Sequence, residues 1–393
     1  MSTNEFLSPW YYGTAYYIFF LIVSWITVLY YVGSNQQKIL RSEGNPMQGV
    51  AVLLTMALIF FIGLRPNAKI FGDMFFYSHT YNNVLFQYTS FSLHTEWLWD
   101  NLMFFFKSSG FNVNEFYLFI AFVYFGGMLL CSLMLMRNNL WIALLFFFTA
   151  FSCYSYSTNG MRNGFACSIA LVAITLLTMS KSKHVVAYIL FFLLLGIHRS
   201  SLLPAAAAIA SVYFIKDTKT AIRFWLISIA ISLTIGPLVE QFFAALGFDD
   251  RMSDYASTNQ GEGTAAQFSQ TGFRWDFLLY SGFGTAMVWY VTRYRRFTDR
   301  AYIIIANTYL LCNAFWIMVI RSSFSNRFAY LSWFIYPLVM AYPLLRMNLW
   351  KDQDRKTALI FFFYSGFTFF MFFIFYFGTG NGFRGFNQYW WRD

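Results

Sequence analysis

The sequence predicts an all-α protein, a single integral membrane domain over residues 1–393 with about twelve transmembrane helices. Hydrophobic residues make up 58% of the chain and charged residues only 11%, whereas roughly 25% of an ordinary soluble domain is charged. Aromatic residues reach 23%, more than one core would bury and typical of a surface that faces lipid and its interfaces. These observations exclude a water-soluble enzyme, a disordered chain and a nucleic-acid-binding protein.

The apolar segments are long enough to cross a bilayer as helices. About 20 residues span roughly 30 Å of hydrocarbon, where an open backbone would leave its polar groups unsatisfied. The predicted spans are 11–33, 47–64, 116–136, 140–157, 163–180, 185–198, 201–215, 222–246, 276–292, 301–320, 328–345 and 357–377.

The distribution of basic residues predicts the topology. No Lys or Arg precedes Lys38, so the first segment lacks the basic region of a signal peptide and is expected to enter with its amino end outside. With twelve crossings, 16 of the 27 basic residues lie in inner turns. The net charge of +10 therefore needs no polyanionic partner.

Two long loops then face the outside. Residues 65–115 form the first, in which 97–107 is too short and too mixed to span and is expected to form an amphipathic helix on the membrane surface. Residues 247–275 form the second, a polar segment expected to be mobile and to order over a substrate. The four cysteines lie in apolar segments without metal spacing and are expected to be packing residues, and no metal site is predicted from ligand spacing.

The segment that opens the first outer loop carries a group of polar side chains. Asp73, Tyr77 and Tyr81 are spaced four apart and share one face of a helix, with Arg65 upstream. One carboxylate and two phenols would therefore point the same way. The alternative is a carboxylate that stabilises a helix start above an aromatic interface stripe.

Three short outer turns combine arginine with other polar residues. They are 159–164, 198–201 and 321–327, the last followed by Tyr330. Positive charge is disfavoured on the translocated side, and the guanidinium fork matches phosphate oxygens, so these turns suggest phosphate binding. The alternative for each arginine is a side chain that extends to the lipid headgroups.

In this order, the polar motifs resemble those of the EpsG-type family of Wzy-like polysaccharide polymerases. The motifs are Gly72, Asp73 and Tyr77; Arg162 and Asn163; His198 and Ser200; and Asn326, Arg327 and Tyr330. Glu96 also resembles a family position. One departure is Arg199, because a small residue or proline is commoner between the histidine and the serine.

The resemblance implies a fold related to the glycosyltransferase C superfamily and a multi-pass protein of the bacterial inner membrane. Its active face would be periplasmic or extracellular. It would extend an O-antigen, capsule or exopolysaccharide from polyprenyl diphosphate-linked oligosaccharide, among membrane lipids and other polysaccharide assembly proteins. No cofactor and no nucleic acid is expected.

The same resemblance, together with the chemistry of the side chains, predicts the site. Arg162 and Arg327 would hold the donor diphosphate, and Asp73 or His198 would accept the proton of the attacking sugar hydroxyl. The predicted substrate-binding residues are Arg65, Tyr77, Tyr81, Glu96, Asn163, Ser200, Arg321, Asn326 and Tyr330.

Two other functions remain open on the sequence. A flippase for the same lipid-linked sugars would fit a helix that is interrupted by Pro237 and bears the acid Glu240. An O-antigen ligase or an acyltransferase would use similar chemistry on another acceptor.

Overall fold

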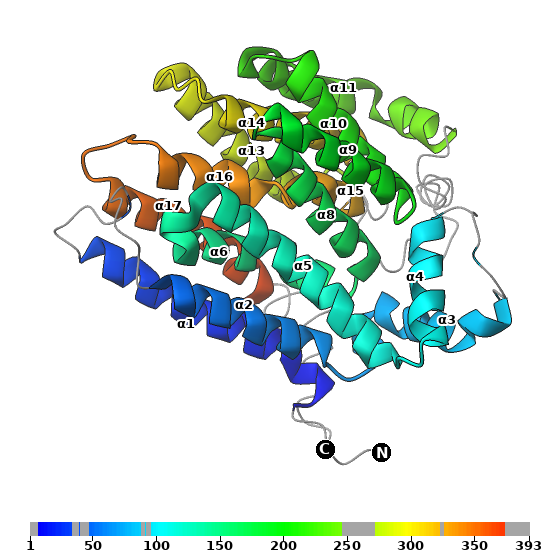
Figure 1. Cartoon of the computed structure of the whole chain (residues 1–393). Helices are drawn as coiled ribbons and strands as arrows, with labels where there is room; N and C mark the ends of the chain where they lie inside the picture. The colour runs from blue at the N-terminus through cyan, green and yellow to red at the C-terminus, as the bar shows by residue number, and fades with distance from the viewer. Residues whose placement is uncertain are drawn as a thin grey trace.

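The computed structural model is a bundle of α-helices (Figure 1). It describes residues 7–33, 39, 47–87, 91, 96–245, 272–322 and 326–373, and no strand occurs within these ranges. The α-helices are α1 (Tyr12–Val32), α2 (Met47–Gly63), α3 (Asp73–Gln87), α4 (Trp97–Ser108), α5 (Val113–Met136), α6 (Leu140–Phe148), α7 (Cys153–Thr158), α8 (Met161–Leu177), α9 (Lys181–Leu195), α10 (Leu202–Tyr213), α11 (Thr218–Ala245), α13 (Trp275–Trp289), α14 (Arg300–Met318), α15 (Asn326–Trp333), α16 (Tyr336–Arg346) and α17 (Gln353–Phe373). Short turns include the 3₁₀ helices η2 (Lys69–Phe71) and η4 (Arg199–Ser201) and the π-helical turn η7 (Tyr290–Tyr294).

The prediction of an all-α membrane protein is confirmed, and each predicted span overlaps one helix or two consecutive ones. Within the described residues, six helical stretches are long and apolar enough to cross a membrane. They are Pro9–Val32, Val113–Phe148, Thr218–Phe242, Arg300–Met318, Arg327–Arg346 and Gln353–Phe373. The count of twelve crossings stays a prediction, because the other helices are shorter.

Two predicted spans are broken in the structure. The fourth, predicted over 140–157, is divided into α6 and α7 by a turn at 149–152. The eleventh, predicted over 328–345, is divided into α15 and α16 by a turn at 334–335, and Pro337 stands in the first turn of α16, where a missing N–H removes no helical bond. These breaks produce two short helices, α7 and α15, that border the candidate site described below.

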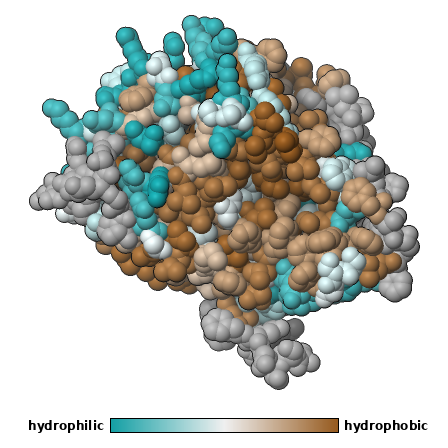
Figure 2. All heavy atoms as spheres, viewed as in Figure 1, coloured by the Kyte–Doolittle hydropathy of each residue, from teal (hydrophilic) through white to brown (hydrophobic). Residues whose placement is uncertain are grey.

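The surface has the distribution expected of a membrane protein. Figure 2 shows hydrophobic side chains across the middle of the visible face and hydrophilic side chains gathered toward its upper left. Large apolar side chains such as Leu53 and Phe363 are 70% and 72% exposed. In water such exposure would be costly, so this part of the bundle is suited to lipid.

The helices α3 and α4 lie in the predicted first outer loop and pack at one end of the bundle, beside the start of α5 (Figure 1). The predicted amphipathic segment 97–107 forms most of α4. The predicted mobile loop over 247–275 lies mainly outside the described residues, which resume at 272.

A buried hydrogen-bond network joins four helices of the carboxy-terminal half. Asn313 of α14 accepts a bond from Trp225 Nε1 of α11 at 2.7 Å. Its Nδ2 donates to Ser281 Oγ of α13 at 3.0 Å and to Ser332 Oγ of α15 at 2.9 Å, and Trp333 Nε1 donates to the same Ser281 Oγ at 2.8 Å. Because burying polar groups without hydrogen bonds is costly, the network fixes the position of α15.

We expect Asn313→Ala to lower the free energy of unfolding by about 1–3 kcal/mol, because three neighbouring polar groups each lose a hydrogen bond. Thermal unfolding of detergent-purified protein measures the effect. Asn83→Ala is the matched control, since Asn83 bonds one turn back to His79 within α3. Equal unfolding midpoints for the two variants would contradict the structural role of the network.

Candidate active site

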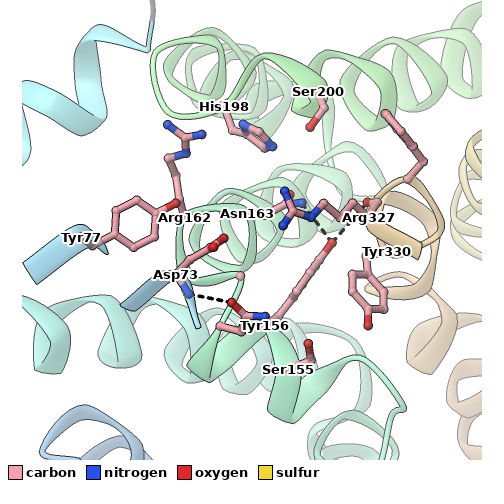
Figure 3. Close-up of a pocket in the computed structure, with 13 residues that line it drawn as sticks. Asp73, Tyr77, Ser155, Tyr156, Arg162, Asn163, His198, Ser200, Arg327 and Tyr330 are labelled. Atoms are coloured by element: carbon pink, nitrogen blue, oxygen red, sulfur yellow. Dashed lines mark hydrogen bonds between the residues drawn. The ribbon is translucent and has the colours of Figure 1, made fainter. Parts of the chain in front are cut away.

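A polar cavity opens at one end of the bundle, where several helices begin. Its volume is about 780 Å³, including the open mouth. Figure 3 shows side chains from the amino-terminal and carboxy-terminal halves of the chain pointing into it. The lining residues are Asp73, Tyr77, Ser155, Tyr156, Asn159, Gly160, Arg162, Asn163, His198, Ser200, Arg327, Phe328 and Tyr330.

Eight of the thirteen predicted site residues line this cavity. They are Asp73, Tyr77, Arg162, Asn163, His198, Ser200, Arg327 and Tyr330. Sequence reasoning missed Ser155, Tyr156 and Phe328. A signal for the first two was present, because 152–158 is an unusually polar run at the end of an apolar segment.

Four helical segments begin at the cavity. Asp73 is the first residue of α3, Arg162 lies in the first turn of α8, His198 directly precedes η4 and α10, and Arg327 lies in the first turn of α15. The first N–H groups of a helix lack partners within it and carry partial positive charge. The cavity therefore combines positive side chains with backbone groups that favour an anion.

The turn at Gly72 aims Asp73 into the cavity. Gly72 has φ +61°, and a Cβ atom there would lie 2.3 Å from Asn159 Oδ1. This close approach lets the Asp73 backbone N–H donate to Asn159 Oδ1 at 2.9 Å (Figure 3). The start of α3 is thus fixed to the turn between α7 and α8, with the Asp73 carboxylate facing the cavity.

Glu96 does not line the cavity itself but bonds to two of the residues that do. One carboxylate oxygen accepts from Arg162 in an ion pair, and Oε1 lies 3.0 Å from Nδ1 of His198. Burial alone would raise the pKa of Glu96, but the hydrogen bond from His198 and the charge of Arg162 lower this pKa below its ordinary value. Glu96 is therefore an ionised carboxylate shared by an arginine and a histidine.

Tyr156 connects the start of α8 to the start of α15 at the cavity. Asn163 Nδ2 donates to its hydroxyl at 3.0 Å, and that hydroxyl donates to the backbone carbonyl of Arg327 at 3.5 Å. The Tyr156 ring also packs edge-on against Tyr330, with centroids 4.4 Å apart. Figure 3 shows the Arg327 guanidinium entering the cavity from a different side than that of Arg162.

Two predicted binding residues lie in the packed interior beside the cavity. Arg65 is 1% exposed and donates to the carbonyls of Ile62 and Thr158 and to Met161 Sδ. Burial lowers its pKa to about 10, so it remains charged at neutral pH. Tyr81 is fully buried, and its hydroxyl donates to the carbonyl of Phe111 at 2.8 Å. Neither side chain lines the cavity.

Two further predicted residues flank α15. The backbone N–H of Arg321 donates to Glu240 Oε1 at 3.1 Å, and its guanidinium lies 5.8 Å from the ring centroid of Phe273. Asn326 begins α15, and its side chain lies outside the described ones. In the part of the chain that the structure describes, no three His, Cys, Asp or Glu residues are placed to hold a metal ion.

The fold and the cavity together define the class of the protein, a helical membrane protein with a polar, arginine-containing site at one end. The model of the EpsG family matches residues 50–391. The chain belongs to this family, whose members are Wzy-like polysaccharide polymerases. No curated protein and no solved structure matches the chain.

We expect Gly72→Ala to destabilise the protein more than Gly110→Ala. Both glycines have positive φ, at +61° and +86°, but an added Cβ meets Asn159 at position 72 and nothing within 4 Å at position 110. Both variants bear the backbone strain of about 1–2 kcal/mol, and only Gly72→Ala adds a clash. Thermal unfolding of the two purified variants measures the difference, and equal midpoints would contradict the close approach.

Proposed function

We propose that the protein extends a bacterial surface polysaccharide by transferring repeat units from polyprenyl diphosphate. The observation that carries this proposal is the meeting of Arg162, Arg327 and Asp73 at one cavity. Two guanidiniums match the oxygens of a diphosphate, and a carboxylate can accept the proton of a sugar hydroxyl. Family membership gives the polymerase class, and the site supplies groups suited to its chemistry.

The transfer is a substitution at the anomeric carbon of the donor sugar. The acceptor hydroxyl oxygen forms the new bond to this carbon while the bond from the carbon to the diphosphate oxygen breaks. Polyprenyl diphosphate leaves with the electron pair, and the hydroxyl proton passes to the base. Because negative charge grows on the leaving oxygen, Arg162 and Arg327 would stabilise the transition state more than the ground state.

Asp73 is the favoured base. Its backbone N–H is bonded to Asn159, but within the described residues no hydrogen bond or ion pair engages its carboxylate, which is free to accept a proton. His198 already shares Glu96 with Arg162, so we assign it to the diphosphate, together with the two arginines. Tyr77 and Tyr330 would contact the sugar rings, since aromatic faces pack well against them.

The distribution of charge supports an outer location for the cavity. The turn between α16 and α17 lies at the opposite end of the bundle from α3 and α4 (Figure 1), and Trp350 in this turn bonds to Tyr290 after α13. Exposed basic residues of these two turns include Arg293, Arg295 and Lys351. Because basic residues are enriched on the cytoplasmic side, this distribution supports a cavity on the periplasmic or extracellular face of the plasma membrane. The proposal also includes twelve membrane crossings and a fold related to the glycosyltransferase C superfamily. The protein would contact membrane lipids and other polysaccharide assembly proteins.

One observation favours a flippase as the second candidate. The helix α11 is interrupted at Ile235, just before Pro237, and carries the buried acid Glu240. Broken helices with buried acids occur in transporters that alternate between two faces. Against it, the Glu240 carboxylate accepts the Arg321 backbone N–H at 3.1 Å, which gives the acid a structural partner.

We expect Arg162→Ala and Arg327→Ala each to reduce polymer formation by about 10²–10³-fold, because each removes a group that stabilises the leaving diphosphate. A host lacking the gene is complemented with each variant, and surface glycans are resolved by gel while lipid-linked intermediates are measured by mass spectrometry. Arg295→Ala is the matched control, since Arg295 is exposed at the other end of the bundle.

The same experiment separates the candidate functions. If single repeat units reach the outer face but the gel shows no ladder of longer glycan chains, the result supports a polymerase. Units held on the cytoplasmic leaflet support a flippase, and a normal ladder in both arginine variants contradicts the proposed site.

We expect Asp73→Asn to lower the turnover of purified protein on lipid-linked oligosaccharide by about 10²–10⁴-fold, the usual range for loss of a general base. Binding of inorganic diphosphate should persist, because the amide removes a negative charge from the cavity. Asp352→Asn is the control, since Asp352 forms an exposed i,i+4 pair with Lys356. Unchanged turnover in Asp73→Asn would rule out this assignment of the base.

A further inference from the structure

The start of α4 has a strained backbone. Glu96 has φ +61°, a left-handed conformation that is common for glycine and asparagine and costs other residues about 1–2 kcal/mol. Its side chain forms no capping bond to the helix that follows. The strain is therefore not explained by helix capping, and the carboxylate is used elsewhere.

The packing of α4 against the end of α9 brings the Glu96 carboxylate close to His198. The N–H groups of Leu98 and Trp99 donate to the carbonyl of Gly196 at 2.7 and 3.0 Å. A Cβ atom at Gly196 would lie 2.7 Å from the Trp97 ring, so this position requires glycine. Because His198 follows Gly196 by two residues, the docking brings Glu96 and His198 face to face.

The shared carboxylate determines how both partners face the cavity. An ionised carboxylate only accepts hydrogen bonds, so Nδ1 of His198 must carry a proton and Nε2 is the ring nitrogen left for a ligand. The same carboxylate holds the guanidinium of Arg162. Arg162 and His198 line the cavity, whereas Glu96 does not.

We propose that Glu96 is a positioning residue that holds Arg162 and His198 as one anion-binding pair for the diphosphate of the donor. The inference rests on the proposed function for the identity of the ligand. Glu96 acts through its two partners, and α4 thereby becomes part of the active site without contacting the substrate. The carboxylate's negative charge near an anion site is unfavourable by itself, and the fixed orientation that it gives to Arg162 and His198 offsets that cost.

The proposal is tested by whether Glu96→Gln weakens or tightens the binding of diphosphate. Calorimetry measures the binding of inorganic diphosphate to detergent-purified protein. If Glu96 only contributed its charge, Glu96→Gln would tighten binding, because a repelling carboxylate is lost. If Glu96 positions its partners, Glu96→Gln weakens binding by about 10-fold or more. Tighter or unchanged binding overturns the proposal.

Turnover on lipid-linked oligosaccharide gives a second readout. A positioning residue acts on the bound donor, so Glu96→Gln should raise the KM for lipid-linked oligosaccharide by about 10-fold or more, in step with its weaker diphosphate binding. A merely structural role would lower the amount of active protein, and with it the apparent kcat, without raising the KM.

Glu96→Gly separates positioning from folding. Glycine relieves the strain at φ +61°, so this variant should unfold at a temperature equal to or above that of Glu96→Gln while losing diphosphate binding to the same extent. Glu115→Gln is the control, since Glu115 accepts a backbone N–H at the start of α5, outside the cavity. Failure of both Glu96 variants to fold would make the residue structural and overturn the proposal.

These outcomes are distinguishable from failure of the proposed function. If wild-type protein binds diphosphate in a Glu96-dependent way but forms no polymer, the positioning role stands and the polymerase proposal fails. If polymer forms and Glu96→Gln matches wild type in binding and turnover, the positioning role fails and the polymerase proposal stands.

Discussion

The start of a helix leaves backbone N–H groups without partners, and a membrane protein must place such groups where something can satisfy them. In this chain, α3, α8, the η4–α10 segment and α15 all begin at one cavity. The positive ends of these helices and the adjacent arginines make this end of the bundle attractive to an anion. The rest of the structure depends on this arrangement, because the apolar helices serve to bring the four starts together.

Close contacts between distant segments maintain the arrangement. Gly72 lets α3 approach Asn159, Gly196 lets α4 dock onto the end of α9, and Tyr156 connects the start of α8 to that of α15. Farther from the cavity, Asn313 holds α15 against three other helices. Each contact joins parts of the chain that are far apart in sequence, so the site is a product of the whole bundle.

The site divides its charged groups into those that face the cavity and those that support them. Arg162, Arg327 and Asp73 reach the space where a substrate would lie, whereas Glu96 stands behind. Arg65 is also charged and buried, but its two terminal nitrogens donate to backbone carbonyls, and the rings of Phe71 and Tyr117 lie beside its guanidinium. Burial of a charged group therefore does not by itself mark a catalytic role.

The sequence alone determined the class of protein and most of the helices. Composition and long apolar runs predicted an all-α membrane protein, because only helices or closed barrels satisfy a backbone in lipid. The order of short polar motifs pointed to the EpsG family, and eight predicted residues line one cavity. Such motifs are visible in sequence because polar residues stand out between apolar helices.

Only the tertiary structure decided which polar residues meet. Helical spacing placed Tyr77 and Tyr81 on one face, but Tyr77 lines the cavity and Tyr81 is buried beside Phe111. Spacing gave no sign that Glu96 joins Arg162 to His198, or that Tyr156 supports Arg327. The physical reason is that local periodicity fixes which residues share a helix face, whereas packing fixes how each helix is rotated and where it stops. The rotation and the end of each helix depend on contacts between residues far apart in sequence, such as Arg162 with Glu96, His198 with Glu96 and Tyr156 with Arg327.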